Sequence, residues 1–256
     1  MGIGQLVLIF IGAFILYSTA KNFGLVLMFF AMRRYSKDED KTGALAQIEK
    51  ALNFPMPPSP KLTCAYILLK EGRPDKAEEV IAPLRTVETK RFNSNEARLH
   101  YSLIYWKKGE LDKAIESLEE LMAEGYRNSI LYGNLGVYLI EKGDLDRALE
   151  VTQEGLEYNS SSLLIRDNLG LIYIKKKEWD EAARVYDELL TEIPGFPDPY
   201  YNRALIHKQS GQWEEARDLL IKAEGKSYNY LSTLALEQVQ SLLEEADRAI
   251  LESSNG

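Results

Sequence analysis

The sequence predicts an all-α fold, a solenoid of helix-turn-helix repeats, and two observations predict it. A ten-residue pattern recurs five times, as in GELDKAIESL at 109–118 and GDLDRALEVT at 143–152. Its alanines are separated by 37, 34, 34 and 34 residues, and a fixed period of this length indicates stacked structural repeats. The composition agrees, because 45% apolar and 27% charged residues are globular values. The aligned alanines are Ala77, Ala114, Ala148, Ala182 and Ala216.

Each repeat divides into two amphipathic segments at a turn. A glycine stands at the turn in most repeats, as at Gly109 and Gly143, and ends the first helix because glycine tolerates a left-handed backbone. Lys177 takes this position in one repeat. The first segments share a register of small residues that predicts close helix crossings, namely Ala65, Ser102, Gly136, Gly170 and Ala204.

The 34-residue helix-turn-helix period resembles the tetratricopeptide repeat (TPR) family. Trp179 and Trp213 fill a register where the family usually has an aromatic residue, and Pro194 stands at the family's closing proline. The resemblance covers about residues 58–230 and implies a right-handed TPR α-solenoid. Its five units are expected at 58–94, 95–128, 129–162, 163–196 and 197–230.

Helical segments are also predicted on both sides of the repeats. A half-repeat and linker are expected over 35–57, where residues 43–55 have the pattern of a second helix, and 25–38 would supply the first. Residues 231–256 are expected to form an amphipathic capping helix and a tail, because the last repeat of a solenoid needs a cap with a polar outer face.

The N-terminal segment predicts a membrane anchor. Residues 3–20 carry no charge over 18 residues, about the length that crosses a hydrocarbon core. Residues 1–34 are therefore expected to form a transmembrane helix and a juxtamembrane segment; a cleaved signal peptide and a buried core helix are the alternatives. Basic residues follow the span and none precedes it, which places the repeats in the cytoplasm of a single-pass protein in a bacterial-type inner membrane.

Composition argues against several functions. The net charge of −8 disfavours nucleic acid as a partner, and one cysteine with two histidines disfavours a metal centre. The sequence has no phosphate-binding glycine loop and no HExxH or GxSxG motif. We therefore expect no enzyme activity, no cofactor and no small-molecule substrate.

The resemblance instead implies a concave groove lined by the first helix of each unit. One groove position carries His100, Asn134, Asn168 and Asn202, so three asparagines form a ladder at the repeat spacing. Their amides would either bind the backbone of an extended peptide or bond within their own solenoid. The other candidate groove residues are the apolar Leu103, Trp106 and Tyr201 and the rim lysines Lys107 and Lys175.

These features predict a membrane-anchored scaffold or adaptor that binds a protein partner or an extended peptide in its groove. The family's carboxylate clamp is disfavoured, because Leu99, Leu103 and Leu164 stand where the clamp needs polar or basic residues. An assembly factor facing the envelope and a regulatory subunit of a membrane enzyme complex are the alternative functions.

Overall fold

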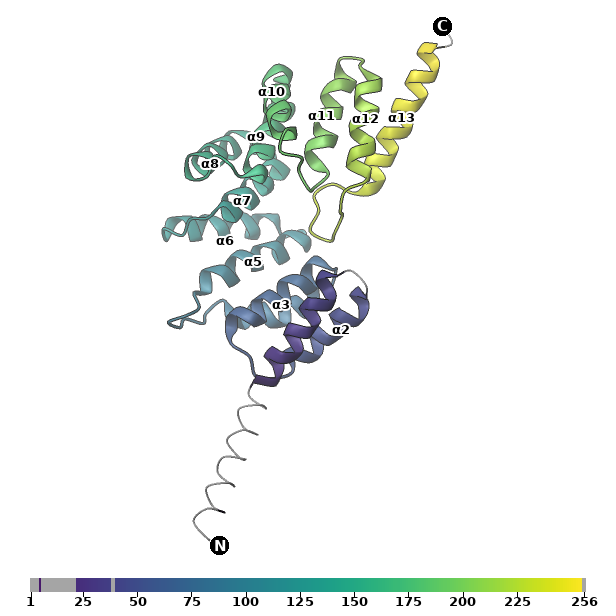
Figure 1. Ribbon diagram of the computed structural model, residues 1–256. Coiled ribbons are helices and arrows are strands. Elements are labelled where there is room, and N and C mark those ends of the chain that lie inside the picture. Colours follow the sequence, from purple (N-terminus) through teal and green to yellow (C-terminus); the bar gives the residue numbers. More distant parts are fainter. Residues whose placement is uncertain (1–4, 6–21, 38–39, 255–256) are drawn as a thin grey trace. The chain divides into compact units, whose positions relative to one another are not determined.

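The structure is a computed structural model that describes Gln5 and residues 22–37 and 40–254. The chain divides into two compact units, residues 1–101 and 102–256. Within the described residues both units consist of helices joined by turns, and the only β pairing recorded there is an isolated bridge between Thr89 and Phe92 (Figure 1). The described part of the chain is thus an all-α solenoid, as the repeat pattern predicts.

The first unit begins with a helical hairpin. A helix over residues 22–36 pairs with α2 (Lys41–Leu52), where Gln47 Nε2 donates to the carbonyl oxygen of Leu27 at 3.3 Å. The rings of Phe23 and Phe54 meet edge to face at 4.9 Å. The sequence predicts helices over 25–38 and 43–55 here, and the structure has them over 22–36 and Lys41–Leu52. That they form a half-repeat stays a prediction. The helices that follow the first one are α2 (Lys41–Leu52), α3 (Pro58–Lys70), α4 (Pro74–Leu84) and the first part of α5 (Ser94–Lys107).

The predicted single-pass membrane localisation is corrected by the structure. Apart from Gln5, the proposed transmembrane helix over 3–20, like the signal-peptide alternative, lies outside the described residues. In the part of the chain that the structure describes, no helix combines the length and apolar character that a membrane crossing requires. The helix over 22–36 illustrates the reason, because its apolar run ends at Arg33 and Arg34 and its Ala31 is buried within the protein's own fold.

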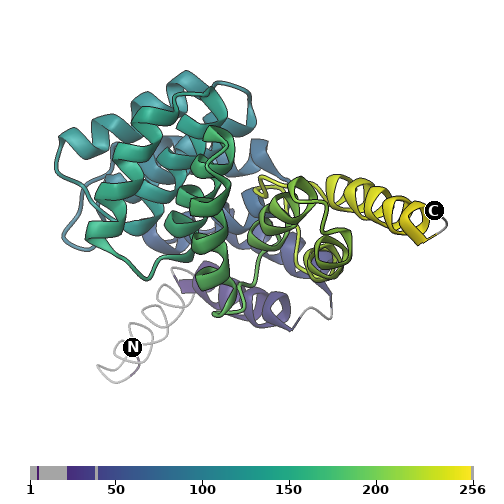
Figure 2. The same ribbon diagram turned by 90° about the horizontal axis from the view of Figure 1, so that it is seen from above.

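The second unit consists of stacked helix pairs followed by a last, single helix. Figures 1 and 2 show α13 (Leu236–Ser254) beside α12 (Trp213–Glu224) as the last element. Buried residues of α13, such as Val239 and Leu242, join one core with Tyr200 and Leu220, so α13 packs against the last repeat. That it serves as a cap stays a prediction. The helices after α5 are α6 (Leu111–Ala123), α7 (Ser129–Lys142), α8 (Leu145–Tyr158), α9 (Leu163–Lys176), α10 (Trp179–Leu190), α11 (Asp198–Gln209), α12 (Trp213–Glu224) and α13.

The C-terminal helix is shorter than predicted. It spans Leu236–Ser254, so residues 226–235, part of which were assigned to the cap, form a loop. Asn229 accounts for the difference, because its side chain accepts from Leu231 N at 2.9 Å and its carbonyl accepts from Ser232 N at 3.0 Å. Asparagine and serine stabilise turns in this way and compete with a helix.

Small residues let the paired helices approach closely. All five aligned alanines are at most 1% exposed. On α9, a Cβ atom added at Gly170 would lie 2.6 Å from ring atoms of Tyr186, which is itself fully buried. The predicted crossings between the two helices of a repeat are therefore present, with the alanine on the second helix and the small residue on the first.

The turn between α9 and α10 lacks the glycine found elsewhere, and Lys177 adopts the left-handed conformation there with φ 62° and ψ 26°. Left-handed backbone costs a non-glycine residue roughly 1–2 kcal/mol. We expect Lys177→Gly to raise the free energy of unfolding by about 1 kcal/mol. Lys175→Gly, inside α9, should lower it by about 0.5–1 kcal/mol. Urea titrations followed by circular dichroism measure both, and the account of this turn fails if the two variants change stability in the same direction.

Candidate functional site

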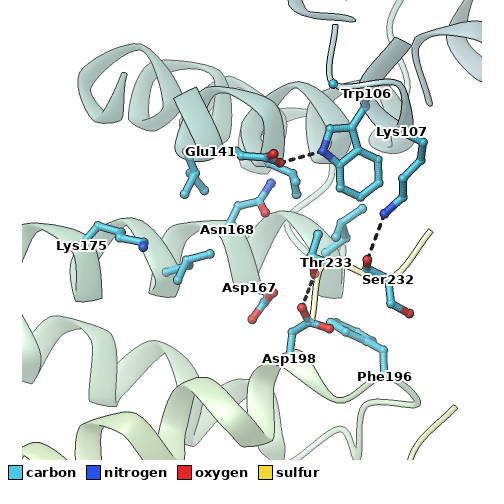
Figure 3. Close-up of a pocket in the computed structure, with 15 residues that line it drawn as sticks. Trp106, Lys107, Glu141, Asp167, Asn168, Lys175, Phe196, Asp198, Ser232 and Thr233 are labelled. Carbon is cyan, nitrogen blue, oxygen red and sulfur yellow. Dashed lines mark hydrogen bonds between the residues drawn. The ribbon is translucent and has the colours of Figure 1, made fainter. Parts of the chain in front are cut away.

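The second compact unit contains a cavity of about 660 Å³ on the face formed by the first helix of each repeat. Helices α5, α7 and α9 supply most of the lining, and the α10–α11 connection, the start of α11 and the loop over 226–235 complete it (Figure 3). Its lining residues are Trp106, Lys107, Gly109, Val137, Ile140, Glu141, Leu164, Asp167, Asn168, Leu171, Lys175, Phe196, Asp198, Ser232 and Thr233. The volume is within the range of ligand and side-chain binding sites.

Trp106 and Lys107, both predicted groove residues, form one end of this cavity. The indole Nε1 of Trp106 donates to Glu141 Oε2 at 2.6 Å, and Lys107 Nζ lies 3.7 Å from the centre of the Trp106 ring. Lys107 Nζ also donates to the carbonyl oxygen of Ser232 at 3.2 Å, so the late loop reaches the cavity (Figure 3). Partial burial lowers the pKa of Lys107, and the charge of Glu141 opposes that shift.

The asparagine ladder uses much of its hydrogen-bonding capacity within the fold. Asn168 is 1% exposed and its Nδ2 donates to the carbonyl oxygen of Gly133 at 2.8 Å. Asn202 Nδ2 donates to Asp167 Oδ1 at 3.3 Å. Asn134 Nδ2 is buried without a hydrogen-bond partner in the described structure. The geometry at Asn168 and Asn202 therefore matches the second alternative, bonding within the solenoid, and whether any of the three binds a peptide stays a prediction.

Asn168→Ala is expected to lower the free energy of unfolding by about 1–3 kcal/mol, because the buried Gly133 carbonyl loses its donor. Asn134→Ala is the matched control on α7. Asn134→Ala should lower the free energy of unfolding by less than Asn168→Ala, because Asn134 Nδ2 donates no hydrogen bond in the described structure. Equilibrium urea unfolding of both variants measures the difference. Equal losses would contradict a structural role for the Asn168 amide.

The remaining predicted residues are spread over different places. Lys175 lines the main cavity as an exposed residue at the end of α9. Leu103 does not line it and is only 7% exposed, which is a packing position. Tyr201 lines a second cavity of about 400 Å³ between α11 and α13. Only part of the predicted set therefore lies around one cavity.

His100 belongs to the first unit, where its ring lies 4.9 Å from that of Tyr66. Burial lowers the pKa of His100 to about 4. The imidazole is therefore neutral at physiological pH. His100 is not among the residues that line the cavity described above.

Two aspartates also line the cavity, Asp167, which the sequence places at a groove position without making it a candidate site residue, and Asp198, which the sequence analysis does not name. Asp167 is 5% exposed on α9, and Asp198 is the first residue of α11. Burial and the nearby charge of Asp198 raise the pKa of Asp167 well above its usual value, and burial also raises the pKa of Asp198. The sequence does mark Asp198 as the residue after Pro197 at the start of a helix. This pattern indicates a helix N-terminus and does not by itself indicate a binding site.

A stack of helix pairs with a cavity on its first-helix face defines an α-solenoid repeat protein. The sequence matches family models described as tetratricopeptide repeat over residues 64–128, 102–160, 134–197 and 173–231. The chain therefore belongs to the tetratricopeptide repeat family. No curated protein matches the sequence.

Solved structures of other repeat proteins are similar to this chain. TTC0263, a thermophilic TPR protein of Thermus thermophilus, shares 22% identity over 76% of this chain and all of its own, with a TM-score of 0.59. YrrB, described as a TPR protein with an unusual peptide-binding site, shares 18% identity over 85% of this chain and 97% of its own, with a TM-score of 0.46. MamA MSR-1 shares 23% identity over 65% of this chain and 94% of its own, with a TM-score of 0.47. At these identities the similarity concerns the fold alone.

Proposed function

We propose that this chain is a protein-interaction scaffold whose cavity in the second unit binds a segment of a protein partner. The observation that carries the proposal is the cavity itself, about 660 Å³ in volume and lined by residues of three successive first helices. Repetition of the helix pair places these side chains at regular intervals, so the lining can contact successive residues of an extended chain. Membership of the TPR family supports an interaction role, and that the chain is not an enzyme stays a prediction.

The walls of the cavity suit a peptide segment. Val137, Leu164 and Leu171 supply apolar surface, and Trp106 supplies an aromatic anchor held by Glu141. Buried aromatic residues carry a large share of the binding energy in protein interfaces. Backbone and side-chain polar groups lie between these apolar residues, as at Asn168 and Ser232, and such groups fix the orientation of a bound segment.

The proposal predicts that Trp106→Ala weakens partner binding by about 2 kcal/mol or more. Tagged full-length protein is used to purify partners from cells, and each purified partner is then titrated with wild type and variant. The control is Arg184→Ala on α10, whose side chain is 73% exposed and does not line the cavity. Wild-type affinity in Trp106→Ala, or an equal loss in Arg184→Ala, would contradict binding in this cavity.

A further inference from the structure

The acidic end of the cavity lacks a cationic partner. Asp167 accepts a hydrogen bond from Asn202 at 3.3 Å, and Asp198 accepts one from the hydroxyl of Thr233. Neither carboxylate forms an ion pair with a lysine or arginine of the described chain. A buried carboxylate is costly unless a cation or several hydrogen bonds compensate it. In the described structure, the negative charge of these two carboxylates is therefore not compensated by a positive charge of the fold.

The two lining lysines do not supply that charge. Lys107 Nζ donates to the carbonyl oxygen of Ser232 and lies over the Trp106 ring, and in the described structure no ion pair joins it to Asp167 or Asp198. Lys175 lies at the far end of α9, away from Asp198 in Figure 3. The same view shows the carboxylates of Asp167 and Asp198 on the same side of the cavity, next to Phe196. The cavity thus combines an anionic end with an aromatic ring beside it.

This combination matches a basic side chain. The guanidinium of arginine donates to two carboxylate oxygens at once and stacks on an aromatic face, and lysine adds a point charge on an apolar stem. Leu164 and Leu171 line the same cavity and would contact the aliphatic part of either side chain. An acidic or phosphorylated segment would instead bring like charge to two partly buried carboxylates.

The geometry points to a specificity for basic segments: an arginine or lysine side chain of the protein partner enters this cavity and pairs with Asp167 and Asp198, beside Phe196. The inference rests on the proposed function, because it names the chemistry of the segment that the same cavity binds. It adds a requirement that the proposed function does not contain, namely that the bound segment carries a positive charge at one position.

The test is a selection of random twelve-residue peptides on the full-length chain, followed by titration of the enriched peptides. We expect arginine or lysine at one fixed position. Replacing that residue by uncharged citrulline or norleucine should weaken binding to wild type by about tenfold or more. In Asp167→Asn or Asp198→Asn the same replacement should have little effect, because the charge partner is gone. Asp180→Asn, on an exposed residue of α10, is the matched control and should retain the full discrimination.

The results separate this inference from the proposed function. Enriched peptides that lack a basic residue, yet lose binding in Trp106→Ala, would overturn the inference and leave the proposed function standing. Discrimination against citrulline that persists unchanged in Asp167→Asn and in Asp198→Asn would also overturn it. Selection that enriches no peptide contradicts both. Circular dichroism of each variant verifies that it folds, and asparagine keeps the Oδ1 acceptor that Asn202 uses in the wild type.

Discussion

Ala182→Trp is expected to unfold the repeat that contains it, with a loss of about 3 kcal/mol or more in the free energy of unfolding. Ala182 is 0% exposed and lies in a core with Ile174, Tyr186 and Ile206. A tryptophan there has no space, because the surrounding side chains belong to three helices that approach closely at small residues. Neighbouring repeats share this core, so the loss should extend beyond one helix pair.

Thermal unfolding monitored by circular dichroism measures this loss. Arg184→Trp is the matched control, because it places the same ring two residues later on α10, where the side chain is 73% exposed and makes one surface ion pair. The control should change stability by less than about 0.5 kcal/mol. A melting curve for Ala182→Trp that matches the control would show that the repeat register described here is wrong.

Asp167→Asn is expected to stabilise the protein at neutral pH, by about 1–3 kcal/mol. The pKa of this carboxyl is raised in the folded state, so folding favours its protonated form over the charged one. The stability that this group contributes is therefore present below its ordinary pKa of 3.8 and is lost as pH rises through the raised pKa. The asparagine variant has no such loss.

Urea midpoints of wild type and Asp167→Asn across a pH series measure the effect. The difference between the two should be small near pH 3.8 and should grow with pH in favour of the variant. Asp180→Asn, which is exposed, should show no comparable growth. A variant less stable than wild type at every pH would mean that the charged carboxylate stabilises the fold, in contradiction to this account.

Much of the fold could be predicted from the sequence, because repetition reveals packing. An alanine at one register of every repeat indicates a helix crossing, and Ala148 and Ala182 are indeed fully buried. The turn glycines also predicted where the first helices end, since Gly143 adopts the left-handed conformation, with φ 86°, at the end of the first helix of its repeat. Periodic features such as these depend on local geometry that every repeat shares.

The candidate site was less predictable, because it depends on contacts that do not repeat. Lys107 and Ser232 meet across 125 residues, and no periodic pattern indicates where the loop over 226–235 lies. The orientation of the Asn168 amide depends on how closely α9 approaches Gly133, which residue identity alone does not give. The position of Asp198 at the start of α11 depends on the non-helical connection before that helix, and the repeat pattern does not predict the course of that connection.

Stability and binding are expected to oppose each other at the acidic end of the cavity. Asp167 costs folding free energy in the absence of a partner, and a cationic side chain would recover that cost on binding. The same substitution, Asp167→Asn, should therefore raise the unfolding midpoint and remove the preference for a basic peptide. Two independent measurements on one variant thus connect the electrostatics of the cavity to its proposed specificity.

The central claim, that a partner segment lies in the cavity of the second unit, is tested most directly by site-specific photo-crosslinking. A photoreactive p-benzoylphenylalanine is placed at Val137, which lines the cavity, or at Arg184, which is exposed on α10 and does not. The full-length protein is irradiated with its purified partner, and crosslinked peptides are mapped by mass spectrometry. The account predicts a crosslink from position 137 to one continuous segment of the partner and none from position 184. Crosslinking from position 184 alone would contradict it.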